Sequence, residues 1–218
     1  MLSTNNNCYQ PNSEQKMQFP DPGDGSHLAT RYRLMAAAAK LMAVSGYSGT
    51  SLRAIATGAG VTTGAIYTCF PGGKEALFRA ILDMVHQEVA RFVAEGITAT
   101  EPVGFMLQQA GGLWDFFAQY PSFAALIVRE NISGSLGDPS PFFDQQAGSI
   151  QQLRGLIQAA VAAGQMAPVN PGHLLFQVTS HVTAYHGCRP LRAAVFTDDE
   201  LLTARSAFLA SLRHQLEP

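Results

Sequence analysis

The sequence predicts an all-α protein with two helical parts, and three observations support this fold class. No segment of the 218 residues alternates apolar and polar residues as a strand does, whereas apolar residues recur at helical spacing from residue 27 onward. Residues 1–26 are instead rich in Asn, Gln, Pro, Gly and Ser. Charge is also divided, because residues 26–80 carry a net charge of +5 and residues 81–218 carry −5. We therefore expect a disordered arm over 1–26, a basic three-helix domain over 27–80, and a larger helical domain over 81–218.

Composition argues against several other classes of protein. Hydrophobic residues make up 47% of the chain and charged residues 14%, as in a soluble globular protein. No uninterrupted apolar run reaches the length of a membrane span, and no basic patch followed by an apolar run marks a signal peptide. The three cysteines lie far apart, which favours free thiols in a reducing compartment. We expect a cytoplasmic protein that does not associate with membranes.

Residues 50–70 have the spacing of a helix-turn-helix. After a first helix over 27–45, Ala56, Gly60 and Ile66 follow one another at intervals of four and six residues. In this motif a small residue lets the second helix cross the first closely, a glycine makes the turn, and an aliphatic residue packs the two helices together. Hydroxyls of Thr50 or Ser51, and then of Thr62 or Thr63, can cap the two helices.

The outer face of the second helix of this motif carries no charge. Its residues are Thr62, Thr63, Gly64, Tyr67 and Thr68. Short hydroxyl donors and acceptors with one aromatic ring suit the base edges and phosphates of a DNA major groove. We therefore expect this face to contact double-stranded DNA.

Residues 46–78 resemble the DNA-binding segment of the TetR family of bacterial transcriptional regulators. The matching residues are Gly46-Tyr47, Thr50-Ser51, Ile55-Ala56, Ala59-Gly60-Val61, Gly64, Tyr67, Phe70-Pro71 and Lys74-Glu75-Ala76-Leu77. Cys69 departs from the pattern, since the family often has a histidine there, and this puts a family-typical backbone contact in doubt. The resemblance implies a DNA-binding repressor whose second domain binds an inducer and whose last helices form a homodimer.

Four further residues are expected to hold DNA phosphates: Tyr47, Thr50, Ser51 and Lys74. Lys74 begins a long amphipathic helix over 74–97, where its ammonium group and the first main-chain N–H groups can face the same anion. The alternative is an ordinary surface lysine.

Helical patterns continue over 102–119, 121–131, 141–164, 171–186 and 198–216, and residues 132–140 read as a loop. Gly111 and Gly112, in the middle of the first of these helices, each cost about 1 kcal/mol relative to alanine. Either a close helix crossing or open space for a ligand would account for them.

Eight residues are candidates for the lining of a small-molecule cavity, because such cavities combine apolar walls with a few polar groups. They are Met106, Trp114, Phe117, Phe123, Phe176, Gln177, His181 and Tyr185. Ordinary core packing is the alternative for each aromatic residue and for Met106. Gln177, His181 and Tyr185 share one stripe of the helix over 171–186, so they need partners either in a pocket or across a dimer seam.

Other kinds of site find little support. The spacing of His173, His181 and His186 does not place them on one helical face, so no metal site is expected. The chain has no nucleophile elbow and no Gly-rich phosphate loop after a strand, so we expect neither catalysis nor a cofactor. An architectural DNA-binding protein without ligand control remains the alternative to a ligand-responsive repressor.

We expect a homodimer on a palindromic operator, because one recognition helix reads only a few base pairs. The apolar positions expected at the dimer seam are Leu174, Val178, Val182, Phe208, Leu209 and Leu212.

Overall fold

The computed structural model describes residues 27–95, 99–133 and 141–218. Within them, all regular secondary structure is helical, which confirms the predicted all-α class. The helices are α1 (His27–Gly49), α2 (Leu52–Ala59), α3 (Thr63–Cys69), α4 (Gly73–Glu95), α5 (Pro102–Gln119), α6 (Pro121–Ser133), α7 (Pro141–Ala162), α8 (Pro171–Gly187), α9 (Arg189–Val195) and α10 (Asp198–Leu216). The arm expected over residues 1–26 lies outside the described residues, as does most of the loop expected over 132–140.

Polar side chains fix the starts of several helices at the predicted places. The Ser51 hydroxyl accepts a hydrogen bond from the Ala54 N–H at the start of α2, and the Asn170 side chain accepts one from the His173 N–H at the start of α8. Thr197 and Glu200 form a reciprocal capping box at the start of α10. These bonds satisfy N–H groups that have no partner within their own helix.

Some predicted helix ends shift, and α6 for example continues to Ser133 rather than ending at 131. α1 continues beyond residue 45 to Gly49, although Gly46 breaks it with a positive φ of 73°. α4 is described as far as Glu95, and its expected end at residue 97 lies outside the described residues. α7 ends at Ala162 rather than at 164. The seven-residue α9 was not predicted at all. It has no buried residue, so it leaves no apolar period in the sequence.

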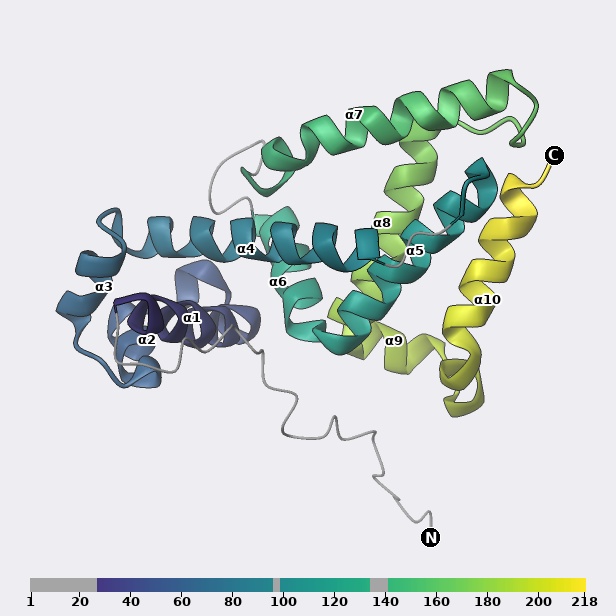
Figure 1. Ribbon diagram of the computed structural model, residues 1–218. Coiled ribbons are helices and arrows are strands. Elements are labelled where there is room, and N and C mark those ends of the chain that lie inside the picture. The colour runs from purple at the N-terminus through teal and green to yellow at the C-terminus, as the bar shows by residue number, and fades with distance from the viewer. Residues whose placement is uncertain (1–26, 96–98, 134–140) are drawn as a thin grey trace, which may run out of the picture.

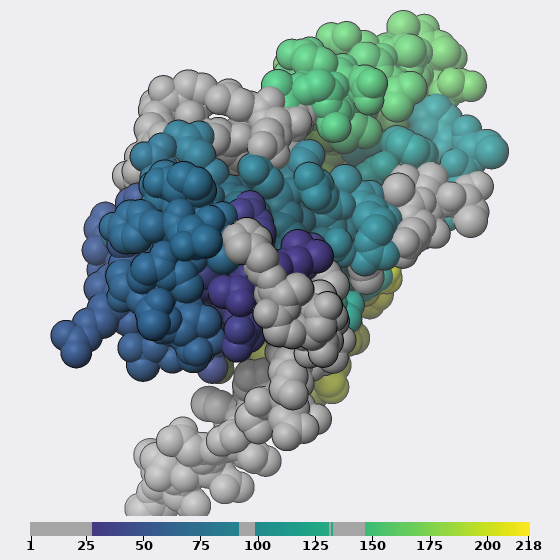
Figure 2. Space-filling model, turned by 60° about the vertical axis from the view of Figure 1, so that its left-hand side comes forward, coloured from purple at the N-terminus to yellow at the C-terminus, as the bar shows by residue number. Residues whose placement is uncertain are grey.

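The helices are arranged along the long α4 (Figure 1). At one end of the molecule, α1, α2 and α3 pack on one another and α4 leads away from them, packing in turn on α5 and α7. α6 packs against both α1 and α8, and α5 lies between α8 and α10. In the space-filling view the helix-turn-helix region and α7 occupy different corners of the molecule (Figure 2).

One hydrophobic core runs through both parts of the chain. Leu77, Phe78 and Ile81, from the first turns of α4, are fully buried in the same cluster as Leu34 of α1. α4 therefore crosses the domain boundary expected at residue 80 and connects the α1–α3 unit to the rest of the core.

Candidate nucleic-acid interface and ligand cavities

The turn between α2 and α3 has the expected geometry. Gly60 adopts a left-handed conformation, with φ 66° and ψ 36°, and its N–H donates to the carbonyl oxygen of Thr57. The Val61 N–H donates to the Ala56 carbonyl at 3.0 Å. Ala56 and Ile66 are buried at 3% and 0% exposure, so the predicted small and aliphatic contact positions do hold the two helices together.

The expected recognition face is open to solvent. All five of its residues are exposed: Thr62, Thr63, Gly64, Tyr67 and Thr68. Tyr67 also packs beside Gly73, where an added β-carbon would lie 3.3 Å from its Cε1 atom. The start of α4 thus supports the ring of Tyr67 while 53% of the residue stays exposed.

The four expected phosphate ligands are placed differently from one another. Ser51 is exposed at the start of α2, and Tyr47 is half-buried beside the Phe78 ring, with centroids 5.1 Å apart. Thr50 is only 4% exposed, and its hydroxyl donates to the Gly46 carbonyl at 2.8 Å. The expectation that the Thr50 side chain lies open to a phosphate is therefore wrong, because it closes the bend after α1 instead.

Lys74 connects α4 to the junction between α1 and α2. Its ammonium group donates to the carbonyl oxygens of Tyr47 and Thr50 at 2.9 and 3.0 Å, and lies 4.3 Å from the centroid of the Tyr47 ring. An ammonium group has three N–H donors, so one remains for an anion. Lys74 is therefore not an ordinary surface lysine, since it holds the start of α4 against the junction between α1 and α2.

Arg31 makes a comparable contact at the other end of the motif. Its guanidinium donates to the Cys69 carbonyl at 2.7 Å and lies 4.1 Å from the centroid of the Phe70 ring. Cys69 itself is buried, and burial raises the pKa of its thiol. Arg31 thereby fixes the C-terminal end of α3 against α1.

Arg53 is an exposed cation that the sequence analysis did not single out. It lies two residues after Ser51 on α2, and its side chain faces solvent. The signal was available in the sequence: a basic residue in the first turn of the helix that precedes a recognition helix. Its placement beside Ser51 makes it a further candidate for phosphate contact.

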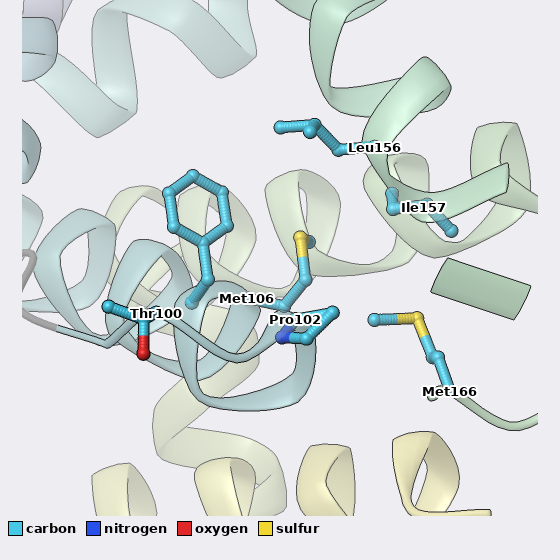
Figure 3. A pocket seen from close by; sticks show the side chains of 7 residues that line it. Thr100, Pro102, Met106, Leu156, Ile157 and Met166 are labelled. Carbon is cyan, nitrogen blue, oxygen red and sulfur yellow. The ribbon is translucent and has the colours of Figure 1, made fainter. Parts of the chain in front are cut away.

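The first cavity lies between the start of α5 and the end of α7, and its volume is about 200 Å³ (Figure 3). In Figure 3 the side chains of Leu156 and Ile157 on α7 lie opposite those of Pro102 and Met106 on α5. The complete lining is Thr100, Pro102, Phe105, Met106, Leu156, Ile157 and Met166. No charged residue belongs to it, so this cavity suits a neutral, largely apolar molecule.

The second cavity is a groove of about 330 Å³ between α8 and α10. Gln177, His181 and Tyr185 line one side, and the small residues Ala204 and Ala207 lie on the other. Beneath it, the Trp114 ring of α5 stacks on Phe208 at 5.5 Å and lies 4.5 Å from Tyr185. We call this cavity the α8–α10 groove. Its lining residues are Gln177, His181, Tyr185, Phe196, Glu200, Thr203, Ala204, Ala207, Phe208, Ser211 and Leu212.

The structure does not bring the eight expected ligand residues into one cavity. Met106 lines the α5–α7 cavity, whereas Gln177, His181 and Tyr185 line the α8–α10 groove and Trp114 lies beneath it. Phe117 and Phe123 both pack against Phe116 in the core, and Phe176 is 72% exposed. The core alternative thus describes Phe117 and Phe123 correctly, while Phe176 lies at the surface.

His186 is the most strongly perturbed group in this region. It is 6% exposed, and its Nε2 atom has no hydrogen-bond partner among the described residues. Burial, together with the nearby Arg192 cation, lowers its pKa to about 4 despite the opposing charge of Asp115. Burial lowers the pKa of His181 as well. Both rings lie against Trp114, His181 in the wall of the groove and His186 in the core, and burial favours the neutral imidazole at both positions.

The residues expected at a dimer seam belong to the core of the protomer. Leu174, Val178, Val182, Phe208 and Leu212 are each at most 9% exposed, and Leu209 is half-buried. The exposed large apolar residues of α8 and α10 are instead Phe176 and Leu202. That list of seam residues was therefore wrong, because α5 and α6 pack on α8 and α5 packs on α10 within the protomer.

Neither a membrane span nor a metal cluster is found where the structure describes the chain. None of the described helices is long and apolar enough to cross a bilayer. No three His, Cys, Asp or Glu side chains of the described ranges are grouped as metal ligands.

Comparison with known proteins identifies the helix-turn-helix region first. The sequence profile of "Bacterial regulatory proteins, tetR family" matches residues 34–81. The chain is 26% identical over 141 residues to the HTH-type transcriptional repressor NicS of Pseudomonas putida, a match that covers 64% of this chain and 61% of NicS. The chain therefore spans about three fifths of the length of that relative.

Solved structures extend the likeness to most of the chain. The putative transcriptional regulator SCO4942 of Streptomyces coelicolor superposes with a TM-score of 0.67 at 24% identity, over 87% of this chain and 99% of that one. AibR, solved in complex with isovaleryl coenzyme A and operator DNA, superposes with a TM-score of 0.61 at 19% identity, over 72% of this chain and 85% of its own. These likenesses show a common fold that contains the helix-turn-helix described above. The helix-turn-helix segment of this chain, residues 34–81, is therefore that of the TetR family of bacterial transcriptional regulators.

Proposed function

We propose that the protein is a sequence-specific DNA-binding repressor that acts as a homodimer and releases its operator when a small apolar molecule binds. The observation that carries the DNA-binding part is the exposed, uncharged face of α3, presented on a helix whose opposite side is anchored by the fully buried Ile66. A rigidly held helix with exposed hydroxyls can place them against base edges in a major groove.

Phosphate contacts would fix this helix in its groove. Ser51 and Arg53 are exposed at the start of α2, and Lys74 keeps one N–H donor beyond the two carbonyls that it holds. These groups carry no sequence information, but they set the register of the protein on the duplex. The net charge of +5 over residues 26–80 favours the same surface for DNA.

Effector control is supported by the α5–α7 cavity and by its connection to α4. Its volume of about 200 Å³ exceeds that of cavities near 150 Å³ that bind benzene. α5 and α7 both pack on α4, and α4 carries Lys74 at its first turn. A ligand that changes the separation of α5 and α7 would therefore shift the attachment of the α1–α3 unit.

The alternative is an architectural DNA-binding protein without ligand control. The open, apolar α5–α7 cavity favours the ligand-responsive reading, because a purely architectural protein has no need of such a space. The fold is compatible with both kinds of ligand, since AibR has been solved with isovaleryl coenzyme A and operator DNA together.

Two substitutions test the DNA-binding face. Thr63→Ala should reduce the preference for operator over random DNA, because Thr63 lies on the face assigned to the bases. Lys74→Ala should weaken all DNA sequences nearly alike, and should reduce the slope of log affinity against log salt by about one. The measurement is fluorescence anisotropy with operator and random duplexes, after genomic fragments retained by the protein have supplied the operator.

Gln152→Ala, at an exposed site on α7, serves as the control and should bind as the parent does. If Thr63→Ala and Lys74→Ala also bind operator like the parent at physiological salt, this face is not the DNA interface.

A further inference from the structure

We propose that Arg31 is a positioning residue for DNA recognition. From α1 it holds the C-terminal end of α3, and it thereby sets how well the protein discriminates its operator from other DNA. This inference rests on the DNA-binding face of the proposed function and adds a residue outside that face. Arg31 acts through the placement of α3 and not through a phosphate contact of its own.

α3 depends on its neighbours for its position. It has seven residues, Thr63–Cys69, and none of them is charged. Helices shorter than about 12 residues are marginal in water unless other elements hold them. The outer side of α3 carries the exposed residues assigned to the base edges, so only its inner side is available for attachment. The accuracy with which the recognition face is placed therefore depends on contacts made by other helices.

Apolar contacts attach the inner side of α3 to the core. Ile66, Cys69 and Phe70 are each at most 5% exposed and belong to the same core cluster as residues of α1 and α4. Such burial is non-directional, so it holds α3 to the core without specifying its tilt sharply. Hydrogen bonds to base edges weaken steeply when their distance or angle is wrong. The tilt of α3 therefore needs a directional contact in addition to burial.

Arg31 supplies this directional contact. Its Nη1 atom donates to the Cys69 carbonyl oxygen at 2.7 Å, and its Cζ atom lies 4.1 Å from the centroid of the Phe70 ring. One planar group thus holds the last residue of α3 and the residue that follows it. A hydrogen bond from a charged donor is about twice as strong as one between neutral groups. Within the described residues, Arg31 is the one side chain of another helix that hydrogen-bonds to α3.

Arg33 provides a comparison within the same helix. It carries the same charge two residues later, and successive residues of a helix point about 100° apart, so it faces away from the Arg31 side. Arg33 is exposed, whereas Arg31 is half-buried. Its guanidinium donates to the Thr30 hydroxyl of α1 itself, at 3.3 Å. The two arginines therefore separate the effect of a positive charge on α1 from the effect of a contact with α3.

Arg31→Met tests the assignment, because methionine keeps an unbranched stem and removes the guanidinium. Dissociation constants are measured by fluorescence anisotropy for operator and random duplexes over a range of salt concentrations. The preference for operator over random DNA should fall by about tenfold or more, the effect of one mismatched base pair. For random DNA, the slope of log affinity against log salt should stay as in the parent. A phosphate ligand would instead weaken both duplexes alike and reduce the slope by about one.

Three further variants complete the experiment. Arg31→Lys keeps the charge and a donor, so it should restore most of the preference for operator. Arg33→Gln removes the same charge from α1 and should leave the preference unchanged. In the double variant of Arg31→Met and Thr63→Ala, the losses of preference should be non-additive, because a displaced α3 no longer makes the contact that Thr63→Ala removes. Circular dichroism at the assay temperature checks folding, and Arg31→Gln, which keeps a neutral donor, repeats the measurement if Arg31→Met does not fold.

Failure of this inference is distinguishable from failure of the proposed function. A folded Arg31→Met variant with the parent's preference for operator would overturn the positioning role and leave the proposed repressor intact. Additive effects with Thr63→Ala, or a salt slope reduced by about one, would also overturn it, because Arg31 would then contact DNA independently of α3. A parent protein that retains no genomic fragment in preference to random DNA would contradict the proposed repressor itself.

Discussion

Lys74 shows how a single residue can be both structural and functional. Its position at the start of α4 was visible in the sequence and suggested a phosphate contact. The structure adds two carbonyl acceptors, Tyr47 and Thr50, that lie more than 20 residues earlier in the chain. Hydrogen bonds from a charged donor are worth about 1.5–3 kcal/mol each. Loss of DNA affinity in Lys74→Ala therefore needs a parallel measurement of stability before it is assigned to a missing phosphate contact.

His186 should make the stability of the protein depend on pH. Its pKa in the fold, about 4, lies below the value of about 6.5 for an unfolded histidine. The unfolded chain therefore binds the proton more tightly, so the contribution is complete above about pH 7 and is lost as the pH falls from 6.5 towards 4. Between pH 7.5 and 5 the free energy of unfolding should fall by about 2 kcal/mol from this group alone.

The measurement is urea unfolding at several pH values, with His186→Phe as the comparison. Phenylalanine keeps an aromatic ring against Trp114 and removes the titrating nitrogen, so the pH dependence of the free energy of unfolding should become flatter over this window. A variant with the same pH dependence as the parent would show that protonation of His186 is not what destabilises the fold.

Residue-scale prediction from sequence succeeded where local chemistry decides the outcome. Ser51 caps α2 and Gly60 takes the left-handed turn, because each role depends on neighbours in the chain. It failed for Thr50 and Phe176, whose environments depend on which other helices lie over them. Thr50 was expected to be open and is buried, and Phe176 was expected in a cavity and is exposed.

Among the elements, α5 determines how the C-terminal part is assembled. At Gly111, an added β-carbon would lie 3.1 Å from a guanidinium nitrogen of Arg205 on α10. Arg205 also forms a bidentate ion pair with Asp115, with both N–O distances 2.7 Å. The sequence left two explanations for Gly111, a close helix crossing or open space for a ligand. The contact with Arg205 supports the first, a close crossing of α5 and α10. The sequence could not pair Asp115 with Arg205, since 90 residues separate them.

Two glycines in different elements should respond oppositely to alanine. Gly60 has a positive φ of 66°, so Gly60→Ala should destabilise the protein by about 1–2 kcal/mol through backbone strain alone. Gly155 lies inside α7 without a positive φ, so Gly155→Ala should stabilise by about 0.5–1 kcal/mol. An added β-carbon meets no atom within 4 Å at either position, so steric contacts do not confuse the comparison.

Urea unfolding of both variants checks this pair, and operator binding adds a functional reading. Gly60→Ala should also weaken DNA binding, because the turn sets the angle between α2 and α3, whereas Gly155→Ala should not. Equal effects of the two substitutions on stability would show that the positive φ of Gly60 is not what the turn requires.

Helices were predictable to the extent that they bury a stripe of apolar residues. α5, α8 and α10 begin where the sequence placed them, because their caps, Glu101, Asn170 and Thr197, coincide with the start of an apolar period. α9 was missed for the complementary reason, since its exposed residues, including Leu191 and Val195, show no periodic burial. The cavities were less predictable still, because each is formed between helices that are distant in sequence.

At the scale of the whole molecule, α4 joins the two parts that differ in charge. It packs on α1 and α3 at one end and on α5 and α7 at the other. Both helices that form the α5–α7 cavity therefore contact the helix that holds the α1–α2 junction through Lys74. This arrangement supplies a physical route from the cavity to the recognition helix without requiring direct contact between them.

The resulting expectation is that a ligand of the α5–α7 cavity weakens operator binding through its different affinities for the two states of the dimer. A coupling of about 1–3 kcal/mol would weaken operator binding about 5- to 150-fold. A panel of neutral compounds the size of substituted benzenes is screened by thermal shift, and each compound that stabilises the protein is then added to an operator titration. Compounds that stabilise the protein but leave operator affinity unchanged would defeat this mechanism.

Leu156→Trp tests whether the α5–α7 cavity is the site of action. Leu156 lines the cavity yet is 56% exposed, so a larger side chain can close the opening with little strain on the core. We expect this variant to keep operator affinity within a few fold and to lose the response to the compound. Gln152→Trp, an exposed position one turn earlier on α7, is the matched control and should keep the response. If Leu156→Trp responds as fully as Gln152→Trp, the compound acts elsewhere, and the α8–α10 groove becomes the next site to examine.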